Sequence, residues 1–113
     1  MTVKLINLNV YDQDWKLGLF VSKYQTGGNI FIGLFDTEHQ EPFADLTINI
    51  QALPEGLSCV NTEDYPWLEQ LIKDTGIGSP TGNYLKSGFG TYPVYKFDLN
   101  KVKEYQINKE EED

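Results

Sequence analysis

Two alternating apolar runs joined by a glycine turn constrain the fold of this chain most strongly. In residues 15–22, "WKLGLFVS", every second side chain is apolar and falls on one face of an extended strand: Trp15, Leu17, Leu19 and Val21. Residues 30–35, "IFIGLF", repeat the pattern through Ile30, Ile32 and Leu34. The intervening "QTGGN" has the composition of a tight turn. The sequence therefore predicts an antiparallel β-hairpin over residues 15–35.

Further strands are predicted on both sides of this hairpin. Residues 43–50, "FADLTINI", indicate one half-buried antiparallel strand, with Ala44, Leu46, Ile48 and Ile50 inward and Asp45, Thr47 and Asn49 outward. Shorter or weaker strand patterns occupy residues 3–10, 57–61 and 94–99. Pro93 favours an edge strand or the start of a strand at the last of these, because proline lacks the N–H that a central strand needs.

One stretch changes to helical periodicity. In residues 63–75 the apolar side chains form a single stripe: Trp67, Leu68, Leu71 and Ile72. Thr62 or Asp64 is a plausible N-cap, and Gly76 is placed to end the helix. Further on, Asp98 could cap a short helix through Val102 and Tyr105.

These elements predict the α+β class. We expect residues 1–108 to form a single α+β domain, in which a mostly antiparallel sheet of about five strands carries one amphipathic helix on one face. Residues 109–113, "KEEED", are predicted to be an acidic flexible tail.

The glycine- and aromatic-rich segment at residues 76–98 raises the question of phosphate binding. Phosphate-cradling loops precede a helix, whose N-terminus attracts an anion. Gly76 and Gly78 instead follow a predicted helix, where the dipole repels phosphate, so they indicate a C-cap and turns. The aromatic residues here favour core and rim positions over a platform for stacking bases or sugars: Tyr84, Phe89, Tyr92, Tyr95 and Phe97.

The charge of the chain limits its partners. Seventeen acidic residues face nine lysines, arginine is absent, and the net charge is −8. A field of this sign disfavours direct binding of DNA, RNA or an anionic membrane. Most of the excess lies in residues 31–80, which carry nine acids against Lys73 alone. This acidic segment indicates either a solvated surface or an attraction for a basic partner.

Catalytic and metal-binding signatures are weak. The chain has one cysteine, Cys59, and one histidine, His39, so no internal disulfide and no cysteine–histidine zinc site is expected. Cys59 is predicted to be a buried small apolar residue, and no local motif pairs it with His39 for nucleophilic catalysis. We therefore expect no enzyme activity, no metal and no cofactor. A start without the features of a signal peptide predicts a cytoplasmic protein.

Three stretches of the chain carry a resemblance to a known family: "FADLTINI", "WLEQLIKDTGIGSPTG" and "SGFGTYPVYKF". Their most specific marks are Pro80–Thr81–Gly82, Ser87–Gly88–Phe89 and Tyr92–Pro93. Over roughly residues 30–99 the chain resembles an uncharacterised family of small proteins, a domain of unknown function of firmicute phages, plasmids and conjugative elements. The resemblance implies a mobile-element context and supplies no catalytic residues.

These observations favour a non-enzymatic protein-binding protein. Within a mobile-element context the leading hypothesis is an inhibitor of a host defence nuclease, such as a CRISPR effector, that blocks its basic nucleic-acid groove. The expected contact residues are the acids Asp36, Glu38, Glu41, Glu63, Asp64 and Asp74. The alternatives are a structural or accessory phage protein and a small-ligand binding module built on the glycine–aromatic segment.

Overall fold

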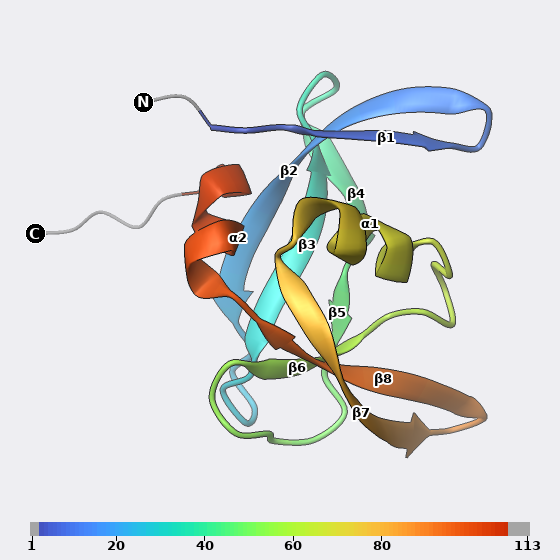
Figure 1. Cartoon of the computed structure of the whole chain (residues 1–113), viewed down its shortest axis with the longest axis vertical. Coiled ribbons are helices and arrows are strands. Elements are labelled where there is room, and N and C mark those ends of the chain that lie inside the picture. The colour runs from blue at the N-terminus through green and yellow to red at the C-terminus, as the bar shows by residue number, and fades with distance from the viewer. Residues whose placement is uncertain (1–2, 109–113) are drawn as a thin grey trace, which may run out of the picture.

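Eight strands and two helices form the described part of the chain in the computed structural model, which covers residues 3–108 (Figure 1). The predicted acidic tail, residues 109–113, lies outside the described residues. The elements in chain order are β1 (Ile6–Val10), β2 (Gln13–Lys23), β3 (Ile30–Asp36), β4 (Glu41–Asp45), β5 (Thr47–Ile48), β6 (Leu57–Val60), α1 (Leu68–Thr75), β7 (Gly78–Ser87), β8 (Gly90–Phe97) and α2 (Leu99–Tyr105).

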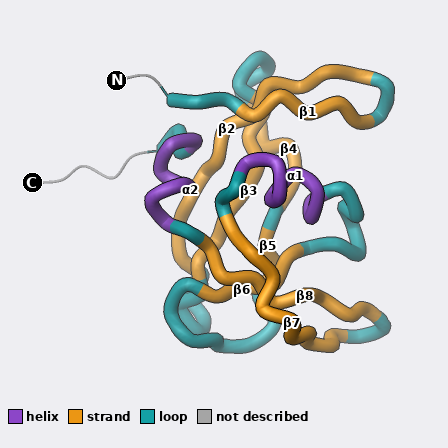
Figure 2. The backbone as a smooth tube through the Cα atoms, viewed as in Figure 1, coloured by secondary structure: helices purple, strands orange, loops and turns teal. Residues whose placement is uncertain are grey.

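The strands form two antiparallel sheets of four rather than one sheet of about five. The first sheet has the order β1-β2-β3-β4 and the second has the order β5-β6-β8-β7. The tube view shows the two sheets at an angle to each other, with α1 in front of them and α2 beside β2 (Figure 2). The prediction of a single, mostly antiparallel domain is confirmed, but the fold is mainly β, with two sheets and two helices, rather than α+β with one sheet and one helix.

The predicted hairpin over residues 15–35 is confirmed. β2 and β3 pair in register through Leu17↔Asp36, Leu19↔Leu34 and Val21↔Ile32. Leu17, Leu19, Ile32 and Leu34 are all at most 1% exposed and belong to the main core cluster. Period-two alternation thus placed the correct face of this hairpin in the core.

The predicted strand over residues 43–50 is split, because the chain passes from one sheet to the other at Leu46. The N–H of Leu46 donates to the carbonyl of Ile32 at 2.9 Å, and its carbonyl accepts from Asn61 N–H at 2.9 Å. Thr47, predicted to face outward, is 1% exposed, and its hydroxyl accepts from the N–H of Ile32 at 3.1 Å. Two consecutive side chains are buried here because the crossing segment has a sheet on either side.

Helix α1 buries three residues of the predicted stripe and begins later than predicted, which leaves Trp67 outside the helix and only partly buried. Leu68, Leu71 and Ile72 are buried in the core. The helix starts at Leu68 rather than residue 63, and its N-cap is Trp67 without a side-chain hydrogen bond, so Thr62 and Asp64 are not its caps. At the other end, Gly76 adopts the left-handed conformation (φ 74°) and caps the helix as predicted.

The short C-terminal helix is also present. Asp98 caps α2 by accepting hydrogen bonds from the N–H groups of Asn100 and Lys101. Beyond α2, residues 106–108 return to β2 along the part of its edge that β1 leaves open: Ile107 N–H donates to Leu19 at 2.8 Å, and the side-chain amide of Asn108 bonds both backbone groups of Val21. The last described residues are therefore hydrogen-bonded to β2, near the start of the chain.

The glycine–aromatic segment forms the β7–β8 hairpin and not only turns. β8 lies between β6 and β7 and Pro93 lies inside it, so the prediction of an edge strand, or of a strand that starts at Pro93, is wrong. The β6–β8 pairing ends at Cys59↔Val94, so Pro93 has no paired residue in β6 and its missing N–H breaks no hydrogen bond of that pairing. Neither α1 nor α2 has the length and apolar character needed to span a bilayer.

Candidate functional site

The six acidic residues predicted as contacts occupy three separate segments. Asp36 ends β3, Glu38 lies in the β3–β4 connection, and Glu41 begins β4. Glu63 and Asp64 follow β6, and Asp74 lies in the last turn of α1. Five of the six are exposed, but Asp36 is only 2% exposed.

Asp36 organises the β3–β4 turn instead of facing a partner. One carboxylate oxygen accepts from the N–H groups of Glu38 and His39 at 3.0 and 3.2 Å, and the other lies 2.7 Å from Nδ1 of His39. Burial opposes ionisation, yet these hydrogen bonds outweigh it and hold the pKa of Asp36 below its ordinary value. The same contact raises the pKa of His39. Asp36 is thus a structural residue of the turn.

Asp74 is separated from the other acids. It accepts a hydrogen bond from Gln70 at 2.8 Å on the exposed face of α1. It also lines an open depression of about 220 Å³ between α1, β1 and Tyr105 of α2. Nothing in these contacts joins it to the segments that carry Glu41 or Glu63.

Five aromatic side chains from four segments pack together. The ring of Trp67 lies 6.4 Å from Tyr11, 6.1 Å from Phe43 and 5.5 Å from Tyr65, and Phe43 lies 4.7 Å from Trp15. The indole N–H of Trp67 also donates to the Tyr11 hydroxyl at 3.3 Å. This cluster joins the β1–β2 turn to β4 and to the segment before α1, and Tyr11 remains 62% exposed.

The conformation of Tyr11 is unusual. Tyr11 and Asp12 form the two-residue turn between β1 and β2, and both have positive φ (56° and 59°). Aspartate adopts this conformation more readily than most residues, but a tyrosine rarely does, so the backbone is strained at Tyr11 and the Trp67 contact helps to hold it. The turn at Tyr11 has no clear signal in the sequence, because the usual residues at these positions are Asn-Gly or Asp-Gly and the chain has Tyr-Asp.

Glu63 and Asp64 directly precede Tyr65 and Trp67 in the segment between β6 and α1. The side-chain amide of Asn61 donates to the Asp45 carbonyl at 3.3 Å and to Asp64 at 3.4 Å, which holds the end of β4 against the acidic segment. Glu63 accepts from the N–H of Thr91 in β8 at 3.3 Å. We call the surface formed by Tyr11, Phe43, Tyr65, Trp67, Glu63 and Asp64 the acidic–aromatic face.

The acids of this region are not neutralised by lysine. The ion pairs within residues 3–108 join Lys4 and Lys101 to Glu104, and His39 to Asp36. None of them involves Glu38, Glu41, Glu63, Asp64 or Asp74, so these carboxylates project a negative field into solvent.

Cys59 and His39, the two side chains considered for nucleophilic catalysis, lie in different sheets. Cys59 is 1% exposed in β6, and burial raises the pKa of its thiol, which makes a thiolate nucleophile unfavourable. His39 lies in a turn of the other sheet, on Asp36. In the part of the chain that the structure describes, no three His, Cys, Asp or Glu side chains gather in the manner of metal ligands.

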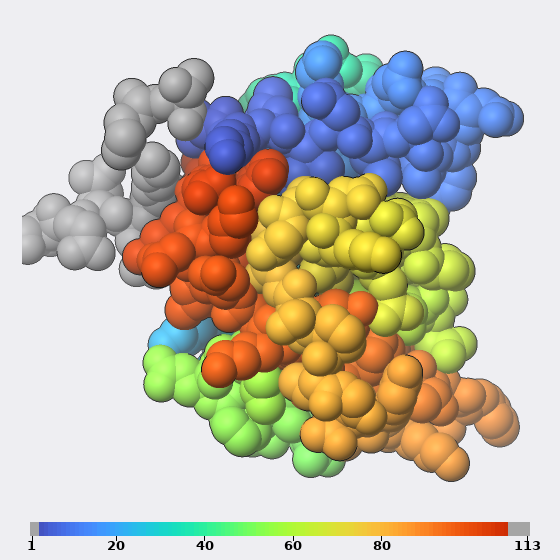
Figure 3. Space-filling model, viewed as in Figure 1, coloured from blue at the N-terminus to red at the C-terminus, as the bar shows by residue number. Residues whose placement is uncertain are grey.

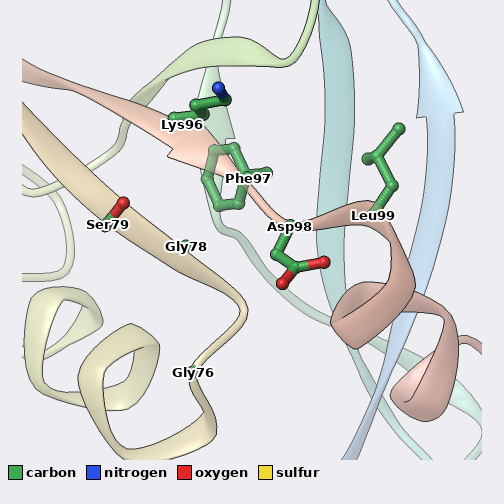
Figure 4. A pocket seen from close by; sticks show the side chains of 7 residues that line it. All are labelled: Gly76, Gly78, Ser79, Lys96, Phe97, Asp98 and Leu99. Carbon is green, nitrogen blue, oxygen red and sulfur yellow. The ribbon is translucent and has the colours of Figure 1, made fainter.

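A second open depression, of about 450 Å³, lies where the α1–β7 and β8–α2 connections meet (Figure 4). It is lined by Gly76, Gly78, Ser79, Lys96, Phe97, Asp98 and Leu99. Its one carboxylate, Asp98, is occupied in capping α2. This leaves Lys96 and Ser79 as the polar side chains at the rim, without a second group to orient a small ligand.

Comparison with known proteins identifies the family. The model of a domain of unknown function, DUF4313, matches residues 18–112. The chain belongs to the DUF4313 family. The match begins earlier than the resemblance at residues 30–99 and reaches into the "KEEED" segment, which is therefore within the family pattern. No curated protein and no solved structure matches the chain.

Proposed function

We propose that this member of the DUF4313 family is a non-enzymatic protein-binding module, and that its acidic–aromatic face meets a basic surface on a partner protein. The observation that carries the proposal is the combination on one face of exposed carboxylates without lysine partners and half-exposed aromatic rings. Aromatic anchors surrounded by charges are the usual composition of an energetically important protein contact.

The electrostatics favour a protein over a nucleic acid. With a net charge of −8 and no arginine, the chain would approach a phosphate backbone against repulsion. A basic groove of a nucleic-acid-binding enzyme is the complementary surface, so a nuclease is the partner class that we propose. The mobile-element and cytoplasmic setting inferred from the sequence is part of the same proposal.

The test is the rate of association with a purified nuclease that has a basic groove, measured by surface plasmon resonance at low and at physiological salt. Neutralising the face in Glu63→Gln/Asp64→Asn should slow association about tenfold at low salt, because exposed charges act mainly on the encounter rate. The difference should shrink at physiological salt, where the screening length is about 8 Å.

A matched control removes the same charge elsewhere. Glu55 and Asp74 are both exposed and lie outside the face, so Glu55→Gln/Asp74→Asn should retain most of the association rate. A flat salt response, or equal effects of the two double variants, would contradict the proposal and leave shape-driven or accessory association in its place.

A further inference from the structure

The outer half of the β7–β8 hairpin is an arm that packs on little of its own chain. Within residues 83–91, which we call the arm, every residue except Leu85 and Gly90 is exposed. Added side-chain atoms at Gly82 and Gly88 would meet nothing within 4 Å. The arm extends away from the body of the molecule as the orange hairpin of Figure 1. A two-stranded hairpin alone is marginally stable in water, so an arm of this kind gains by packing on another surface.

The tip of the arm carries an aromatic ring that the turn does not require. Ser87 and Gly90 close a two-residue turn in which Gly88 has a φ of 62°. Positive φ at the first central residue alone defines a type II′ turn, which needs glycine there but not an aromatic residue next to it. Phe89 occupies that next position and is fully exposed, and Tyr84 on β7 is 62% exposed. Both rings are suited to act as anchors in a contact.

The charge of the hairpin is opposite to that of the rest of the chain. Between Asp74 and Asp98 there is no acidic residue, whereas Lys86 and Lys96 are both present and exposed. Lys86 lies on the arm itself, and no ion pair within residues 3–108 involves it. A cation beside an exposed phenylalanine fits an aromatic surface bordered by carboxylates.

The acidic–aromatic face of a second copy of this chain has that composition. It offers Glu63 and Asp64 to Lys86, and the rings of Tyr65 and Trp67 to Phe89. Within one molecule the arm already lies next to this face, since Thr91 N–H donates to Glu63 at 3.3 Å. Figure 3 shows the yellow-green segment before α1 between the blue β1–β2 end and the orange hairpin. Adjacent complementary patches allow two copies to exchange arms about a two-fold axis, which closes the assembly at a dimer.

We propose that the chain forms a two-fold symmetric dimer in which the arm of each copy docks on the acidic–aromatic face of the other. The inference does not depend on the nuclease partner, because both surfaces belong to this chain. It adds a consequence for that partner: a basic protein and the arm compete for the same face.

Sedimentation velocity at physiological salt, from micromolar to near-millimolar protein, tests the dimer. We expect the wild type to dimerise, and Lys86→Glu and Phe89→Ser each to raise the dimer dissociation constant about tenfold or more. Lys103→Glu makes the same charge change at an exposed site on α2 and should leave the dissociation constant unchanged. Circular dichroism confirms that each variant is folded, which the exposure of all three side chains favours.

A charge exchange identifies the docking site. Glu63→Lys/Asp64→Lys should also abolish the dimer, and mixing this variant with Lys86→Glu should restore it. The mixed dimer has two arm–face contacts. In one, Glu at position 86 of the Lys86→Glu variant meets the two lysines on the face of the other variant. In the second contact, the native Lys86 of that other variant meets the native Glu63 and Asp64 of the Lys86→Glu variant, so both contacts pair opposite charges. A wild type that stays monomeric, arm and face variants that still dimerise, or a mixture of the two variants that stays monomeric would each overturn the proposal.

Discussion

Replacing Thr47 by valine tests the point at which the chain crosses between the sheets. Valine preserves the shape of the side chain but removes a hydroxyl that accepts from Ile32 N–H at 3.1 Å and lies 3.0 Å from the Tyr24 hydroxyl. Because Ile32 is fully buried, its N–H would lose its partner without gaining water. An orphaned buried donor costs about 1–3 kcal/mol. The half-buried Tyr24 hydroxyl can turn toward solvent and adds little.

The assay is urea unfolding followed by circular dichroism, with the slope of the transition checked for constancy. Thr47→Ser is the matched control, because it keeps the hydroxyl and loses one methyl group, worth about 0.8 kcal/mol. We expect Thr47→Val to be the less stable of the two. If Thr47→Val were as stable as the wild type or more stable, the hydroxyl would face water, and residues 43–50 would be one half-exposed strand after all.

Two further predictions concern α1 and the β3–β4 turn. Leu71→Ala should cost about 2–5 kcal/mol in the same urea assay because Leu71 is 3% exposed, whereas the exposed neighbour Gln70→Ala should cost less than about 0.5 kcal/mol. In an NMR titration, His39 should show a pKa above its ordinary 6.5, and Asp36→Asn should return it toward that value. The stabilisation from protonated His39 is therefore full below pH 6.5 and is lost as the pH rises through its raised pKa. The stabilisation from ionised Asp36 is present above pH 3.8 and is lost as the pH falls through its lowered pKa. An unshifted His39 would show that the contact is absent in solution.

The parts of the fold that follow from local periodicity could be predicted from the sequence. Residues close together in the sequence determine which face of β2 and β3 is buried. They also determine the apolar stripe of α1 and the helix caps at Gly76 and Asp98. The sheet switch at Leu46 does not, because the alternation of residues 43–50 is the same whether the strand stays in one sheet or changes to another. The predicted start of α1 is wrong for a related reason. Thr62 and Asp64 are residue types that cap helices, but Asp64 accepts a hydrogen bond from Asn61 and residues 62–64 form a turn ahead of the helix.

The candidate site was predictable in its charge but not in its geometry. Composition located the acidic middle segment, and five of the six acids chosen there are exposed. Asp36 could not be distinguished from the others, since its burial results from the fold of the turn around it. The aromatic half of the face was missed because its rings come from three segments that only the tertiary structure brings together. The β7–β8 arm could not be predicted because the glycines and prolines of its segment also favour turns.

The return of residues 106–108 to β2 has a consequence for how the protein is made. The hydrogen bonds of Asn108 to Val21 span 87 residues, and they complete the edge of a strand that is synthesised long before its partner. During translation, the part of the β2 edge that β1 does not pair with would stay open until residue 108 has left the ribosome. Open strand edges on partly folded chains pair readily with other chains. The interval between the emergence of β2 and that of Asn108 is therefore when the nascent chain is most prone to aggregate.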